Sequence, residues 1–246
     1  MATENVDVFL GLPRGSFDHI PSYCKAQALA AIAEVRILEQ NGIFRTGVHY
    51  IVLMDLCAST EAAKLLGQKL HEQRIQSFVT AAVAALGGGY LKAYAHFVKQ
   101  IGDAVLLIFS SFIDLVSWWR EAHDLFTLYS SAWNREVDTS GKPVLTNDLM
   151  GVFQIRAKTV VHIGEISYFD RNDPISVAVN QIFKIEKKFG PGDLGATQNV
   201  FDVAEPFFAQ LDLTPTRAGS SKLPGHTLET PLWLLESDEA SKYDLA

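Results

Sequence analysis

Two acidic side chains stand where predicted strands end. Asp55 closes the apolar run HYIVLMDL, residues 49–56, and Asp103 follows Gly102 within FVKQIGDAVLLIFS, residues 97–110. If these strands are sheet neighbours, both carboxylates project at one end of the sheet. Two adjacent carboxylates repel one another unless a cation separates them, and hard oxygen ligands suit Mg²⁺ or Mn²⁺ carrying a triphosphate. The pair favours such a metal site, although a strand end or a helix cap would also explain Asp55, and a simple turn would explain Asp103.

The segments around both aspartates predict a strand and a hairpin. Residues 49–56 are short, β-branched and apolar, which favours a buried strand over a helix. In residues 97–110, alternation precedes a tight turn and a continuous apolar run follows it. This pattern predicts two antiparallel strands that reverse at Gly102 and Asp103.

The rest of the chain alternates between helical and strand patterns. An amphipathic helix is predicted near the N-terminus over residues 22–40, where it would pack on its own domain or on a second subunit. The further elements expected, in chain order, are a helix over 59–86 capped by Ser59 or Thr60, a helix over 111–137, a polar loop over 138–148, a strand over 152–166, a helix opened near Pro174 and ended by Gly190, and a strand with a helix over 194–211.

The order strand, helix, hairpin, helix, strand, helix is that of a split βαβ domain. The expected fold class is therefore α+β, a ferredoxin-like domain with a mainly antiparallel sheet and its helices on one face. A doubly wound sheet is the alternative that the alternation leaves open. We expect an N-terminal extension over residues 1–46, a central domain over 47–208, and a C-terminal extension over 209–246 with a mobile polar end.

Composition excludes several classes of protein. The chain has 246 residues, 48% of them hydrophobic, which suffices for one full core. A net charge of −7 without a basic run argues against a nucleic-acid surface. No apolar run reaches the roughly 20 residues that a membrane-spanning helix needs. Cys24 and Cys57 have neither zinc spacing nor the density of a disulfide scaffold, so we expect buried thiols in a soluble, cytoplasmic protein.

Four segments resemble, in their order and spacing, the catalytic domain of the class III nucleotidyl cyclases. They are YIVLMDLCAST, KQIGDAVLLIF, VVHIGEI and DPISVAVNQIFKIE, within the region from Gly47 to Glu205. The resemblance implies two divalent metal ions, Mn²⁺ or Mg²⁺, held by Asp55, the backbone carbonyl of Leu56 and Asp103. It also implies a homodimer whose two active sites are shared between the subunits, with metal ligands from one chain and base and ribose contacts from the other.

The same resemblance assigns residues to the substrate. Asn180 would position the ribose, and Lys99 and Asp173 stand at the positions that resemble the adenine-reading pair of adenylyl cyclases. Lys184 stands where the family usually has an arginine that stabilises charge on the phosphates. A lysine keeps the charge but lacks the planar fork of arginine, so a weakened enzyme is expected rather than an inactive one. A solvated helix face is the alternative reading of Lys184.

The base that the protein would select is a separate question. Tyr50, at the start of the first strand, would shorten the base pocket and donate or accept one hydrogen bond, which suits a one-ring base. A tyrosine in the core or at its rim is the equal alternative. The compact domain, the preceding helix, Tyr50 and Lys184 together resemble the bacterial pyrimidine cyclases of antiphage signalling, the Pycsar family. That resemblance implies conversion of UTP to 3′,5′-cyclic UMP and pyrophosphate. The alternatives are a cytidylate or adenylate cyclase, or a degenerate, cyclase-like regulatory homodimer that binds nucleotide.

Overall fold

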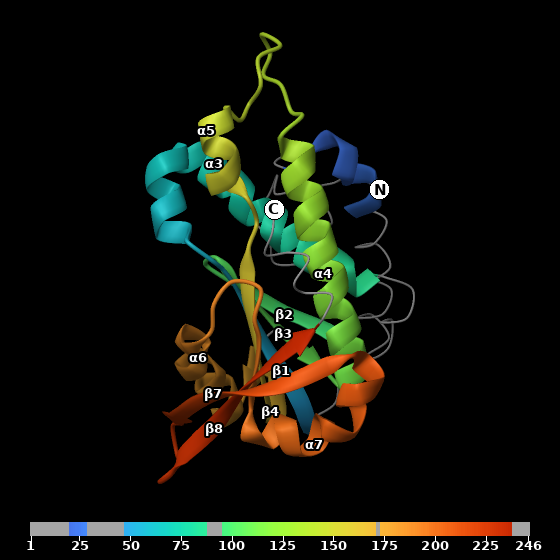
Figure 1. Ribbon diagram of the computed structural model, residues 1–246, viewed down its shortest axis with the longest axis vertical. Helices are drawn as coiled ribbons and strands as arrows, with labels where there is room; N and C mark the ends of the chain where they lie inside the picture. Colours follow the sequence, from blue (N-terminus) through green and yellow to red (C-terminus); the bar gives the residue numbers. More distant parts are fainter. Residues whose placement is uncertain (1–19, 29–46, 88–94, 171–172, 238–246) are drawn as a thin grey trace.

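A single β-sheet forms the centre of the protein in the computed structural model, which describes residues 20–28, 47–87, 95–170 and 173–237 (Figure 1). The strand order is β2-β3-β1-β4-β6-β8-β7, and β5 pairs with β4 off this path. The strands are β1 (Gly47–Leu56), β2 (Ala95–Ile101), β3 (Ala104–Phe109), β4 (Ala157–Asp170), β5 (Asp173–Ile175), β6 (Leu194–Thr197), β7 (Leu213–Lys222) and β8 (Glu229–Ser237).

Helices cover both faces of the sheet. They are α3 (Ser59–Ala84), α4 (Phe112–Trp133), α5 (Asn147–Phe153), α6 (Val177–Ile185) and α7 (Gln198–Phe208). On one face, Val52 and Met54 of β1 join a core with α3, α4 and α7. On the other face, Ile51 and Leu53 pack with α6. The expectation of helices on one face only is therefore wrong, because α6 lies on the opposite side of the sheet from α4 (Figure 1).

The sheet is mixed rather than mainly antiparallel. β1 runs antiparallel to both of its neighbours, β3 and β4. β4 and β6, however, are parallel and are joined through α6. A parallel pair needs such a crossover, whereas the hairpin β2-β3 needs only its turn. The α+β class is confirmed, and the mainly antiparallel sheet is corrected by this β4-α6-β6 unit.

The start of the described chain packs on its own domain. Residues 22–28 are helical, and the remainder of the helix predicted over 22–40 lies outside the described residues. Cys24 is completely buried in the core beneath α4. The backbone N–H of Ser22 donates to Oε1 of Glu136, just beyond α4, at 2.7 Å. The long N-terminal amphipathic helix is therefore not confirmed, although its first turns are helical.

Several boundaries differ from those predicted. α3 begins after Ala58, whose φ is +57°, and no side chain caps its N-terminus, in contrast to the expected Ser59 or Thr60 cap. Gly67, with φ +72°, interrupts α3 at a backbone conformation that glycine adopts without strain. α5 occupies part of the segment expected as a loop. α6 starts later than predicted, after the side chain of Ser176 accepts a hydrogen bond from the backbone N–H of Ala178.

The C-terminal extension adds a hairpin to the sheet. β8 pairs with β6, and β7 pairs with β8 at the edge. The indole of Trp233 stacks on Phe201 of α7, with 4.2 Å between ring centroids, and Arg217 lies over the Trp233 ring. This hairpin was not predicted, because β7 is mostly polar and exposed. The polar end expected to be mobile, residues 236–246, starts within β8, and residues 238–246 lie outside the described residues.

Within the described segments, no helix is both long enough and apolar enough to span a bilayer.

A histidine lies inside the aromatic core of α4. The His123 ring packs edge-on against Trp119 and Phe126, with centroid separations of 5.1 and 5.4 Å. Burial lowers the pKa of His123 to about 4, because the protonated ring would lose its hydration. The folded protein therefore binds this proton less readily than the unfolded chain does.

We predict that His123→Phe flattens the acid side of the pH–stability curve. The contribution of His123 to the free energy of unfolding should fall by about 3 kcal/mol as pH drops from 6.5 to 4, since in that window this histidine takes up a proton only in the unfolded chain. Urea unfolding at several pH values measures this slope, and the exposed His226→Gln is the control for loss of a histidine. An unchanged slope in His123→Phe would contradict the prediction.

Candidate active site

The two aspartates of the predicted metal site lie at one end of neighbouring strands. Asp55 is opposite Ala104 in the β1-β3 ladder, and the backbone N–H of Leu56 donates to the carbonyl of Asp103 at 3.0 Å. Gly102 and Asp103 form the turn of the β2-β3 hairpin, and Gly102 has φ +63°. The predicted neighbourhood of the two strands is therefore confirmed, and it brings the backbone of Asp103 beside the end of β1.

The Asp55 carboxyl is partly buried among charged groups. Its pKa is raised to about 6, chiefly by burial and further by the charges of Asp103 and Glu186. Lys158 opposes this rise through a hydrogen bond and its charge. The net upward shift means that Lys158 does not compensate for the hydration that the Asp55 carboxylate loses on burial.

Lys158 is a site residue that the sequence analysis missed. It lies opposite Asp55 in the β1-β4 ladder, and its Nζ is 3.2 Å from Oδ2 of Asp55. The same ammonium group forms a second ion pair with Glu186, in the 3₁₀ turn that follows α6. The two carboxylates raise the pKa of Lys158 despite its partial burial. The sequence signal that could have pointed to Lys158 was a lysine within the mostly apolar strand segment AKTVVHIG.

The third predicted metal ligand is a backbone carbonyl. The carbonyl oxygen of Leu56 accepts a hydrogen bond from Oγ of Ser59 at 3.1 Å, which uses one of its two lone pairs. Two carboxylates and a carbonyl are the hard oxygen donors that Mg²⁺ and Mn²⁺ prefer, and a cation would favour the ionised form of the partly buried Asp55. These residues fit a divalent cation.

Protein groups alone would leave such a cation incompletely coordinated. The described part of the chain has no cluster of three or more His, Cys, Asp or Glu side chains that could hold a metal ion. Mg²⁺ sites of this kind are commonly completed by phosphate oxygens and water. Water would complete the coordination of a cation at Asp55, Asp103 and the Leu56 carbonyl in the free protein, and phosphate oxygens would do so with a nucleotide present.

Asn180 and Lys184 lie together on the exposed side of α6. They are four residues apart, so they share one helix face, and both are exposed. The opposite side of α6 buries Ala178, Ile182 and Ile185 against the sheet. The structure thus presents both predicted substrate residues away from their own sheet.

The close approach of α6 to the sheet depends on Gly164 in β4. A Cβ atom at Gly164 would overlap the Cβ of Ala178. Behind the helix, His162 of β4 bonds Thr197 through Nδ1 at 2.9 Å and Gln181 through Nε2 at 2.8 Å. The absence of a side chain at Gly164 and the buried hydrogen bonds of His162 therefore set the position of α6, the helix that carries Asn180.

The predicted base-contacting residues lie apart from this arrangement. Lys99 is on β2 opposite Leu106, just after a register shift, and is half-buried. Asp173 begins β5, with its backbone opposite Asp170. The two residues therefore lie on separate strands. β2 is at one edge of the sheet, whereas β5 pairs with β4.

Tyr50 lies in the core on the opposite face of β1 from Asp55. Its side chain is 7% exposed, belongs to the cluster that contains Val52 and Met54, and lies 5.7 Å from the ring of Phe112 of α4. Burial raises the pKa of its phenol. The structure does not bring Tyr50 beside Asp55, and this placement fits the core alternative. A role for Tyr50 in base choice stays a prediction.

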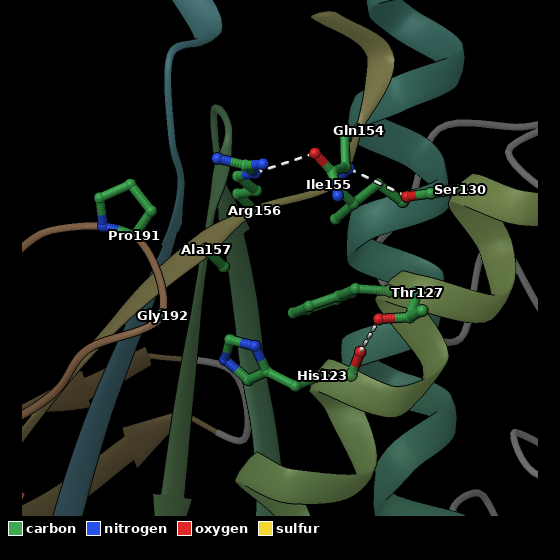
Figure 2. Close-up of a pocket in the computed structure, with 10 residues that line it drawn as sticks. His123, Thr127, Ser130, Gln154, Ile155, Arg156, Ala157, Pro191 and Gly192 are labelled. Carbon is green, nitrogen blue, oxygen red and sulfur yellow. Dashed lines mark hydrogen bonds between the residues drawn. The ribbon is translucent and has the colours of Figure 1, made fainter. Parts of the chain in front are cut away.

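A separate pocket lies between α4 and the start of β4 (Figure 2). The backbone N–H of Ile155 donates to Oγ of Ser130 at 3.0 Å, and Nε of Arg156 donates to Oε1 of Gln154 at 2.9 Å. None of the predicted site residues lines it. The lining residues are His123, Phe126, Thr127, Ser130, Gln154, Ile155, Arg156, Ala157, Pro191 and Gly192.

Solved structures of adenylyl and guanylyl cyclases share this fold. The adenylyl cyclase CyaB from P. aeruginosa superposes with a TM-score of 0.55 and 14% identity, over 79% of this chain and 97% of the other. An adenylate cyclase of Trypanosoma brucei gives 0.54 and 14%, over 77% and 88%. An adenylate/guanylate cyclase/hydrolase from Silicibacter pomeroyi gives 0.51 and 21%, over 79% and 99%. At these identities the likeness shows the fold. No family model and no curated protein matches the chain.

We predict that Asp55→Asn stabilises the metal-free protein. Its free energy of unfolding at pH 7.5 should rise by about 1–2 kcal/mol, because burying an amide costs less hydration than burying a carboxylate. The contribution of Asp55 to the stability of the wild type falls as pH rises from about 4 to about 6, since the folded carboxyl holds its proton more tightly than the unfolded one. The variant should lack that fall.

Thermal unfolding with and without Mn²⁺ completes this test. Mn²⁺ should raise the Tm of the wild type and leave that of Asp55→Asn unchanged, because a ligand stabilises only the state that binds it. Asp202→Asn, which removes an exposed carboxylate from α7, is the charge-matched control and should respond like the wild type. Destabilisation by Asp55→Asn at pH 7.5 would contradict the raised pKa of Asp55.

Proposed function

We propose that the protein is a nucleotidyl cyclase that converts UTP to 3′,5′-cyclic UMP and pyrophosphate as a homodimer. The observation that carries the proposal is the meeting of Asp55, the Leu56 carbonyl and the Asp103 backbone at the end of β1, within a fold shared with adenylyl and guanylyl cyclases. The sequence motifs around these residues support it independently, because they resemble the metal-binding segments of class III cyclases.

In this reaction, the ribose 3′-oxygen forms a bond to the α-phosphorus. The bond from that phosphorus to the oxygen bridging the α- and β-phosphates breaks, and pyrophosphate leaves with the electron pair. The 3′-hydroxyl proton passes to solvent or to the leaving group. Two divalent ions held by Asp55, the Leu56 carbonyl and Asp103 would neutralise the triphosphate and lower the pKa of the hydroxyl.

Lys158 has a defined part in this proposal. It bridges Asp55 and Glu186, so an ammonium group stands ready at the place where the triphosphate would add negative charge. With divalent cations bound at Asp55, Lys158 would keep Glu186 as a partner and would bond a phosphate oxygen. It would thereby orient the leaving pyrophosphate without being left as an unpaired charge.

The second subunit would supply the remaining contacts. Asn180 and Lys184 are exposed on α6, which suits residues that act across a subunit boundary. Asn180 would hold the ribose through its amide. Lys184 would stabilise charge on the phosphates with a single ammonium contact, which is weaker than the bidentate contact of an arginine.

The choice of UTP rests on the resemblance to the Pycsar cyclases, which would also place the protein in antiphage defence. CTP and ATP are the alternative substrates, and Lys99 with Asp173 would favour ATP. Tyr50→Phe tests the hydroxyl alone, because the ring keeps its contact with Phe112. A changed base preference in that variant would assign base contact to the phenol, and an unchanged one would leave Tyr50 in the core.

We predict that the purified protein with Mn²⁺ converts UTP to cyclic UMP, and that Asp103→Ala lowers turnover at least about 100-fold without unfolding the dimer. Chromatography with mass spectrometry identifies the product from separate incubations with ATP, GTP, CTP and UTP. Asp202→Asn is the control for loss of a carboxylate elsewhere. Cyclic CMP or cyclic AMP would replace the proposed substrate, and no product with any nucleotide would favour the regulatory nucleotide-binding homodimer.

We predict that two inactive variants restore activity when mixed. A heterodimer of Asp103→Ala with Asn180→Ala would contain one site with both changes and one intact site, because metal ligands and ribose contact come from different subunits. After unfolding and joint refolding, about a quarter of wild-type activity should return, since half of the dimers are mixed and each has one intact site. Absence of recovery in a mixture shown to contain heterodimers would place all these residues in one chain's site.

A further inference from the structure

A buried arginine lies behind the proposed metal site. Arg74 of α3 is 2% exposed and is among the largest fully buried side chains. Its guanidinium donates to carbonyl oxygens of Cys57, Phe153 and Gln154 at 2.8 to 3.2 Å. Its Nη1 is buried and has no hydrogen-bond partner among the described residues. An arginine is costly to bury unless its charge is used, so its partners indicate what it does for the protein.

Arg74 ties together two backbone segments that are distant in sequence. One is the turn from β1 into α3, held through the Cys57 carbonyl at 2.8 Å. The other is the link between α5 and β4, held through both Phe153 and Gln154. The forked guanidinium can donate in several directions at fixed angles, whereas lysine offers a single point of charge.

The turn held by Arg74 contains the carbonyl proposed as a metal ligand. The Leu56 carbonyl belongs to the same planar peptide group as the N–H of Cys57, which donates to the Arg156 carbonyl at 2.8 Å. The preceding peptide is fixed by the Leu56 N–H bonded to Asp103, and the following peptide by Arg74 on the Cys57 carbonyl. Three consecutive peptide groups are thus fixed, so the direction of the Leu56 carbonyl is fixed as well.

Arg74 also holds the segment whose Arg156 carbonyl accepts the hydrogen bond from Cys57. Gln154 and Arg156 are two residues apart, and Arg74 holds Gln154 while Arg156 accepts from Cys57. Figure 2 shows the same segment along the pocket wall, where Ile155 bonds to Ser130 of α4. The turn and the segment that braces it are therefore both connected to one guanidinium.

The charge of Arg74 acts on the site as well as its hydrogen bonds. The Asp103 carboxylate raises the pKa of the guanidinium, so the two charges are within electrostatic reach of one another, although burial lowers that pKa overall, to about 10. In the described contacts the donors of Arg74 end on backbone carbonyls rather than on a carboxylate. The hydrogen bonds of Arg74 therefore hold backbone groups, and no ion pair with another described residue neutralises its positive charge.

We propose that Arg74 is a positioning residue for the metal site, which aims the Leu56 carbonyl by holding the Cys57 peptide and the segment that braces it. This inference rests on the proposed function, because it concerns the same ligands. Buried groups that orient metal ligands typically affect metal affinity 10- to 100-fold, roughly, when they are removed.

Two variants of Arg74 and one control test the proposal. Arg74→Met keeps a long apolar stem and removes all donors, and Arg74→Lys keeps one charge without the fork. Trp133→Phe is the control, because it removes a buried side-chain hydrogen bond of similar kind, from Nε1 to Oγ of Ser77 at 2.7 Å, between α4 and α3. The Trp133 ring packs 5.3 Å from the ring of Phe153, whose carbonyl Arg74 holds, and phenylalanine keeps that ring contact.

Mn²⁺ binding to the nucleotide-free protein is measured from free Mn²⁺ by electron paramagnetic resonance, at a temperature where each variant is folded. We expect the Kd for Mn²⁺ to rise about tenfold or more in Arg74→Met, to be intermediate in Arg74→Lys, and to be unchanged in Trp133→Phe. Amide hydrogen exchange at Leu56 and Cys57 should become faster in Arg74→Met and stay slow in Trp133→Phe. If Arg74→Met does not fold, Arg74→Lys carries the comparison.

The outcomes separate this inference from the proposed function. Wild-type Mn²⁺ affinity in a folded Arg74→Met or Arg74→Lys would overturn the positioning role while leaving the cyclase proposal standing. Equal losses in Arg74→Met and Trp133→Phe would overturn it too, because general destabilisation would then explain them. No Mn²⁺ binding by the wild type would remove both the metal site and the inference that depends on it.

Discussion

The partial burial of the Asp55 carboxyl among charged groups at the end of β1 is the constraint on which the rest of the site depends. Asp55 is half-buried near Asp103 and Glu186, and Lys158 forms ion pairs with both Asp55 and Glu186. The strand register enforces this meeting, because Asp55 stands between Ala104 of β3 and Lys158 of β4. The two large apolar clusters on the faces of the sheet supply the stability that tolerates such a destabilising arrangement.

β1 divides its residues between two tasks. Its even positions, including Tyr50, Val52 and Met54, pack against α4 and its neighbours, whereas Ile51 and Leu53 face α6. Asp55 continues the second series at the strand's end, where the core gives way to charged groups. The proposed metal site therefore lies at the margin of the sheet face that α6 covers. The face that α4 covers contributes to the stability of the fold.

The sequence predicted what depends on local pattern. The strand over 49–56 and the hairpin reversing at Gly102 and Asp103 were correct, because alternation and a turn pair are local signals. Lys158 and Arg74 were missed, since a lysine near a strand end and an arginine within HEQR both resemble solvated positions until the tertiary structure buries them. The parallel β4-β6 pair was missed because strand direction depends on a crossover and not on either strand's own residues.

The seat of α6 on the sheet has an evolutionary consequence. No side chain separates the helix from β4 at Gly164, where Ala178 fills the space directly. A larger residue at position 164 would lift the helix, and with it the exposed Asn180, away from the sheet unless position 178 shrank in compensation. Sequences that share this geometry should therefore let positions 164 and 178 vary only together, even though neither residue touches a nucleotide.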